Sequence, residues 1–111
     1  RIPSSQDFIE LESYLRTNGF SGREAEVLKT DSGWLTSSGN GTNESGFNGL
    51  PNGYVSAPGT PTFSEGVATW ATIDVNLAGN NRKMIQLFDE NTIQYVDNPI
   101  QIGAGIRCIK E

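Results

Sequence analysis

The side chains that carry most enzyme chemistry are scarce in this chain of 111 residues. It contains no histidine and one cysteine, Cys108. Without histidine there is no Ser-His-Asp triad and no Cys-His pair, and a zinc site built on histidine or paired cysteines is also excluded. The chemistry left open is that of carboxylates and of hard cations held by oxygen ligands. The sequence therefore predicts no catalytic centre, no metal and no cofactor.

The carboxylates do not suggest the arrangement that glycoside hydrolysis needs. A glycosidase places two carboxyl groups about 5 to 9 Å apart across a cleft. Asp89 and Glu90 are neighbours in a turn-prone stretch, where adjacent side chains diverge. We expect a solvated turn there rather than an acid–base pair.

A cluster of oxygen-bearing side chains lies between residues 40 and 48 and invites comparison with a calcium site. Its members are Asn40, Asn43, Glu44 and Asn48. Only one of these side chains is anionic, whereas calcium sites draw on several oxygen ligands that include carboxylates. We therefore expect a loop held by asparagine side chains in preference to a calcium site.

Cys108 has two interpretations, a nucleophile or a structural thiol. It lies in a predicted terminal strand, residues 106–109, and nothing nearby in the sequence supplies a base that would form the thiolate. We predict a structural role, either as a buried thiol or as half of a disulfide whose partner lies upstream of this chain.

Composition indicates an exported, loop-rich domain. The formal net charge is -5 and the eight basic residues are scattered, which argues against nucleic acid, because phosphate binding depends on clustered Lys and Arg. No apolar run has the length that crosses a bilayer, so we expect no membrane insertion. Thirteen glycines and 19% charged residues are typical of a β-containing domain with long loops. We expect an extracellular or cell-surface location.

The N-terminal third predicts two helices. Ser4 or Ser5 can cap the first, over residues 5–18, and Gly19 ends it. Its apolar stripe should pack on a sheet: Phe8, Leu11 and Leu15. Ser21 and Glu24 have the spacing of a capping box for a second, short helix that ends near Lys29.

The C-terminal half predicts strands. Alternating side chains indicate a strand over residues 67–75, and residues 84–88 and 92–96 should form an antiparallel hairpin. Residues 31–62 form a long, glycine-rich connection instead. Its apolar residues predict an ordered loop, and the expected structural anchors are Phe47, Leu50 and Tyr54.

Three stretches in this order resemble the Fibrobacter succinogenes major paralogous domain family. They are RIPSSQDFIEL at residues 1–11, GFNGLPNGY at residues 46–54 and GIRCIK at residues 105–110. The resemblance implies an α+β domain of C-type-lectin-like fold, related to the sulfatase-modifying-factor group, in which helices flank a small antiparallel sheet. It also implies a single domain over residues 1–111 that lacks an upstream N-terminal segment.

Two functions follow as hypotheses. The first is an extracellular, non-enzymatic module that binds a glycan or a protein at the bacterial cell surface. The residues expected to contact its ligand are Trp34, Asn40, Asn43, Tyr54 and Trp70. The second is a structural or assembly subunit of a surface fibre or larger secreted protein, joined through self-assembly or through an upstream segment. In that case the same aromatic residues belong to the core.

Overall fold

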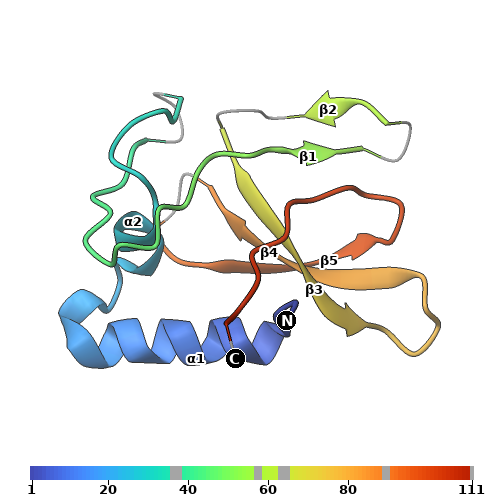
Figure 1. Cartoon of the computed structure of the whole chain (residues 1–111), viewed down its shortest axis with the longest axis horizontal. Coiled ribbons are helices and arrows are strands. Elements are labelled where there is room, and N and C mark those ends of the chain that lie inside the picture. Colours follow the sequence, from blue (N-terminus) through green and yellow to red (C-terminus); the bar gives the residue numbers. More distant parts are fainter. Residues whose placement is uncertain (36–38, 57–58, 63–65, 89–90, 111) are drawn as a thin grey trace.

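A three-stranded antiparallel sheet lies at the centre of the computed structural model, which describes residues 1–35, 39–56, 59–62, 66–88 and 91–110. Its strands are β3 (Ala68–Val75), β4 (Asn81–Leu87) and β5 (Gln94–Pro99), in the order β3-β4-β5. Helices α1 and α2 lie beside this sheet, and both chain ends lie beside α1 (Figure 1). The expected α+β class is confirmed.

Helix α1 (Ser5–Leu15) begins at a capping box. The Ser4 hydroxyl accepts a hydrogen bond from the Asp7 amide at 3.2 Å, and the Asp7 carboxylate accepts one from the Ser4 amide at 2.8 Å. The helix continues as one wider turn, η1 (Arg16–Phe20), in which Gly19 has a φ of +93° that ends the helical path. The first predicted helix is thus confirmed, with its regular part ending at Leu15.

Helix α2 (Glu24–Leu28) starts differently from the expected capping box. Arg23 is the N-cap and makes no side-chain cap bond. Gly22, at a φ of +81°, turns the chain just before the helix, so Glu24 is the first helical residue and not the third. The Ser21–Glu24 capping box is therefore wrong. The Glu24 carboxylate instead accepts from the Gly22 amide at 3.0 Å.

The predicted strand over residues 67–75 is confirmed as β3, and the predicted hairpin as β4 and β5. The two strands pair antiparallel with Met84 opposite Val96. β4 begins before its predicted start and ends one residue short, whereas β5 begins two residues late and extends past its predicted end. The predicted turn residues Asp89 and Glu90 lie outside the described part of the chain.

The predicted terminal strand over residues 106–109 is wrong. Gly105 forms an isolated parallel bridge with Trp70 of β3, and the chain then leaves the sheet. It ends beside the N-terminus, where the Ile109 amide donates to the Arg1 carbonyl at 2.8 Å. The terminal residues therefore pair with the start of the chain and not with the sheet.

The long connection contains two short strands, β1 (Tyr54–Val55) and β2 (Pro61–Thr62), which pair antiparallel. Before them the loop is fastened to the carbonyl groups of α2. The amides of Thr42, Ser45 and Gly49 donate to Glu26, Val27 and Leu28. The loop is thus ordered over its described residues, as predicted.

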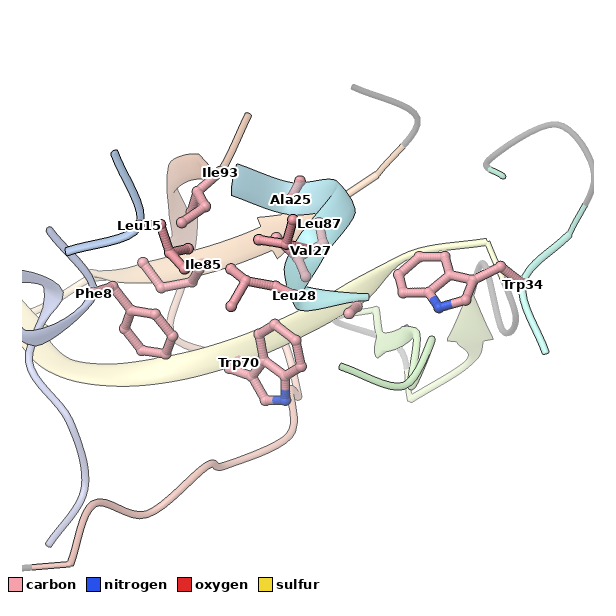
Figure 2. Packing of buried hydrophobic residues seen from close by; sticks show 11 residues of the cluster. Phe8, Leu15, Ala25, Val27, Leu28, Trp34, Trp70, Ile85, Leu87 and Ile93 are labelled. Carbon is pink, nitrogen blue, oxygen red and sulfur yellow. The ribbon is translucent and has the colours of Figure 1, made fainter. Parts of the chain in front are cut away.

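The hydrophobic core joins α1, α2 and the inner face of the sheet. Phe8 and Leu15 come from α1, and Val27 and Leu28 come from α2 (Figure 2). They meet Trp70, Ile85 and Leu87 of the sheet. The Phe8, Leu11 and Leu15 stripe therefore packs as predicted, with Leu11 partly buried.

Candidate functional site

The two tryptophans among the predicted ligand contacts belong to the core. Trp34 and Trp70 are 7% and 5% exposed, and both belong to the core cluster, with Trp34 to one side of the other labelled residues in Figure 2. The Trp70 and Phe47 rings meet edge to face, with 5.6 Å between their centroids. The expectation that Trp34 and Trp70 contact a ligand is corrected, since no ring face is left open to stack on one.

The two predicted asparagines hold the loop. The Asn40 Oδ1 accepts from the Trp34 amide at 3.0 Å. Asn43 and Asn48 bond reciprocally: the Asn43 Nδ2 donates to the Asn48 side-chain oxygen, and the Asn43 Oδ1 accepts from the Asn48 amide. Both residues have positive φ, which asparagine tolerates better than most residues. Their amides therefore act on the loop itself, as the sequence predicted for this stretch.

Tyr54 is the predicted ligand contact that keeps an accessible ring, because its side chain is half-buried. Backbone hydrogen bonds fix the chain on both sides of it. The Gly53 amide donates to the Val67 carbonyl at 2.7 Å, and Val55 and Gly103 exchange two bonds of 2.8 Å. The ring is therefore presented from a rigid stretch of backbone.

Tyr54 separates two surface hollows, and we call them together the Tyr54 site. The first, of about 290 Å³, is bounded by Tyr54, Asn52 and the Gly103-Ala104-Gly105 segment. The second, of about 220 Å³, is bounded by Tyr54, Val67, Gln86 and Phe88. Tyr54 of β1 borders both hollows, and Figure 1 shows β1 alongside β2. The site thus places an aromatic ring between backbone on one side and a second aromatic ring on the other.

The wall of the first hollow depends on Asn52. Its Nδ2 donates to the Thr69 carbonyl at 3.1 Å and its Oδ1 accepts from the Thr69 amide at 2.7 Å, so the side chain replaces a strand partner of β3. Gly105 passes so close that an added Cβ would lie 2.3 Å from the Asn52 Nδ2. These contacts explain why asparagine stands at position 52 and glycine at position 105.

The wall of the second hollow offers hydrogen-bonding groups. The Gln86 Nε2 donates to the Thr69 hydroxyl at 3.3 Å, and no described residue donates to the side-chain oxygen Oε1 of Gln86. Phe88 is 37% exposed, and Lys29 donates to its carbonyl group. The Tyr54 site can therefore stack against a flat apolar surface and accept a hydrogen bond. It contains no nucleophile and no carboxylate among its described residues.

The arginine-paired carboxylates lie elsewhere. Arg1 donates to both oxygens of Asp7 and, with the Ser4 amide, holds the pKa of that carboxyl well below its usual range. Arg23 pairs with Glu26 and Glu44 at 2.7 and 2.6 Å. No group of three or more histidine, cysteine or acidic residues that could hold a metal occurs in the described part of the chain.

Glu24 also pairs with an arginine, and its side chain is fully buried, at 1% exposure. Burial raises the pKa of its carboxyl, but the amides of Glu24 and Gly22 and the Arg16 guanidinium outweigh burial and lower the pKa overall. The Arg16 Nε donates to the Glu24 carboxylate at 3.0 Å. This ion pair joins η1 to α2 and is remote from the Tyr54 site.

Two structural predictions need correction. Cys108 is exposed, with a free thiol, so its interpretation as a buried thiol is wrong. Leu50 is 61% exposed and anchors nothing, because backbone bonds to α2 hold its neighbours instead. Phe47 is partly buried against the core and keeps its predicted structural role, whereas the half-buried Tyr54 is not among the residues that pack on this core.

Sequence reasoning missed Phe88 and Gln86. The relevant signal was the alternation along β4, which places Gln86 and Phe88 on the opposite face from Leu87. Nothing in the pattern indicated that Tyr54 would reach the same face.

The described chain contains no helix with the length and apolarity to span a membrane. Comparison of the chain with protein-family models, with curated proteins and with solved structures finds no match in any of the three.

Proposed function

We propose that this chain is an extracellular, non-enzymatic recognition module that binds a glycan at a bacterial cell surface through the Tyr54 site. The observation that carries the proposal is a tyrosine ring that is accessible, held rigidly and flanked by two hollows. Sugar rings have apolar faces that stack on aromatic side chains and hydroxyl groups that bond to amides. Tyr54, Phe88 and Gln86 offer both kinds of contact.

The location and family in this proposal rest on the sequence. The three motifs that resemble the Fibrobacter succinogenes major paralogous domain favour an exported domain of C-type-lectin-like fold. The described elements are compatible with that fold, because helices lie beside a small antiparallel sheet and a long loop covers one end. The absence of histidine supports a binding role over a catalytic one.

Affinity electrophoresis tests the proposal. The chain is run through native gels that contain soluble β-glucan, xylan, galactomannan or pullulan. We expect at least one polysaccharide to retard the chain, and Tyr54→Ala to remove the retardation. Phe88→Ala should weaken it.

Tyr14→Ala is the matched control. Tyr14 is 63% exposed on α1, so its loss removes an accessible tyrosine without touching the Tyr54 site. Circular dichroism shows that each variant is folded. Retardation that survives in Tyr54→Ala, or the absence of retardation by all four polysaccharides, contradicts the proposal.

An assembly role is the second candidate, and the sheet edge favours it. In the described residues the outer edge of β5 pairs with no strand, so its backbone is open to a strand from another chain. Sedimentation velocity over a range of concentrations tests this role. Assembly that Asp97→Pro abolishes would support it, because the Asp97 amide faces away from β4 and proline removes that donor from the outer edge of β5. A monomer at all concentrations would contradict self-assembly.

A further inference from the structure

A third hollow lies on the α1 side of the molecule. Its volume is about 340 Å³, at the lower end of the range for small-molecule pockets. The C-terminal segment crosses towards α1 (Figure 1), and its residues Arg107, Cys108 and Ile109 line the hollow. We call it the Arg107 hollow.

The walls of the Arg107 hollow are mainly apolar. Phe8 and Leu11 of α1 form one wall, and Phe47 and Ile109 form the other. Space of this size and character accepts one aromatic ring or a branched aliphatic group.

Arg107 adds a positive charge to these walls. Its guanidinium lies 4.0 Å from the centroid of the Phe47 ring, and its Nη2 donates to the Phe47 carbonyl. These two contacts fix the plane of the guanidinium. Its other N–H groups have no acceptor among the described residues, and no described carboxylate pairs with it. The group is therefore positioned and still has donors to offer.

The neighbouring Asp7 does not neutralise Arg107. Its two oxygens accept from the Arg1 guanidinium at 2.7 and 2.8 Å, and one of them also accepts from the Ser4 amide and hydroxyl. The ion pair of the Arg1 and Asp7 side chains is neutral as a whole, so no carboxylate of the described residues compensates the Arg107 charge. This local charge stands out on a chain whose net charge is -5.

We infer that the Arg107 hollow is a binding site for an apolar carboxylate, whose apolar group enters the hollow and whose carboxylate pairs with Arg107. A planar guanidinium binds a carboxylate through two parallel hydrogen bonds, which are stronger than bonds between neutral groups. A free small acid and the C-terminal residue of a peptide share this chemistry. This site is separate from the Tyr54 site and does not depend on the proposed function.

Titration followed by NMR tests the inference with two matched pairs of probes. The first pair is 3-phenylpropanoate and its amide, and the second is acetyl-Gly-Gly-Phe with a free or amidated C-terminus. We expect at least one acid to bind and its amide to bind about tenfold more weakly or not at all. The acid that binds identifies the source of the carboxylate.

Variants locate the binding. Arg107→Gln should weaken the binding of the acid about tenfold or more, and Leu11→Trp should abolish it by filling the hollow. Lys110→Gln removes an exposed positive charge close by in the chain and should leave binding within about twofold. Tyr54→Ala should also leave it unchanged, which separates this site from the glycan site.

Cys108 supplies a second readout, because its thiol is exposed and borders the hollow. A saturating acid should slow the reaction of Cys108 with a thiol reagent in the original chain and not in Arg107→Gln. The inference is overturned if neither acid binds, if acid and amide bind equally, or if Arg107→Gln binds the acid as tightly as the original chain.

Discussion

Phe47 joins three parts of the molecule through one side chain. Its ring meets Trp70 edge to face, at an interplanar angle of 82°, and carries the Arg107 guanidinium on its surface. Its carbonyl accepts the hydrogen bond from Arg107. The sequence marked Phe47 and Leu50 equally as anchors, since both are large apolar residues in a glycine-rich stretch. Only the path of the backbone decides that Phe47 points inward and Leu50 outward.

Alanine substitutions separate these two residues. Phe47→Ala should lower the free energy of unfolding by about 2 to 3 kcal/mol, less than for a fully buried phenylalanine because Phe47 is half-buried. Leu50→Ala should change it by less than about 0.5 kcal/mol, since the side chain is largely in solvent. Urea denaturation measures both. Equal losses would show that Leu50 is buried after all.

At the scale of helices and strands, most of the correct predictions came from the regular spacing of apolar residues. The helical spacing of Phe8, Leu11 and Leu15 indicated α1, and alternation indicated β3, because each pattern reflects one buried face. The loop over residues 39–53 is held in place in a different way. It is fastened through backbone amides to the carbonyls of α2, and backbone bonds leave no side-chain pattern.

The same limit explains why the sequence indicated only part of the candidate site. The sequence led us to expect Tyr54 as a ligand contact, because large aromatic residues in glycine-rich loops often serve recognition, and this stays a prediction. The roles of its neighbours Gln86 and Phe88 could not be predicted. They come close to Tyr54 only because the residues on either side of Tyr54 form backbone bonds with Val67 and Gly103. Sequence also did not distinguish the accessible Tyr54 from the buried tryptophans.

A substitution at Gly41 tests how the loop is fastened to α2. A Cβ at this position would lie 2.3 Å from the Glu26 carbonyl oxygen and 2.5 Å from the Lys29 Cβ. Gly41→Ala should therefore push the loop off the helix and cost about 1 to 3 kcal/mol. Hydrogen exchange at the Thr42 and Ser45 amides should become faster.

Gly22→Ala is the control for Gly41. Its Cβ would enter open space, and only the positive φ opposes it, at a cost of about 1 to 2 kcal/mol. Exchange at Thr42 and Ser45 should then change no more than that of other amides. If Gly41→Ala leaves both amides protected, the loop does not depend on this contact.

For the whole molecule, carboxylates tie together segments that are far apart in the sequence. Asp74 of β3 accepts from the Ser5 amide at 2.6 Å, which joins α1 to the sheet. The Ser5 hydroxyl, and then its amide, lower the pKa of the Asp74 carboxyl. Glu44 pairs with Arg23, which lowers the pKa of Glu44 and joins the loop to the start of α2. Stability should therefore depend on these carboxylates staying ionised.

Acid should destabilise the chain through these groups. The pKa values of the carboxyls of Asp7, Glu24, Glu44 and Asp74 are lower in the folded chain than their ordinary values near 4. Above that ordinary range the unfolded carboxyls are also ionised, and the full stabilisation is present. As the pH falls below about 4, the unfolded chain binds protons first, and stability is lost until the folded groups are protonated as well. Thermal unfolding between pH 7 and pH 2 should show a midpoint that is nearly constant down to about pH 5 and then declines. Asp7→Asn should lower the midpoint at pH 7 and flatten the decline, because its carboxyl no longer contributes; a variant that declines as steeply as the original chain would contradict this role of Asp7.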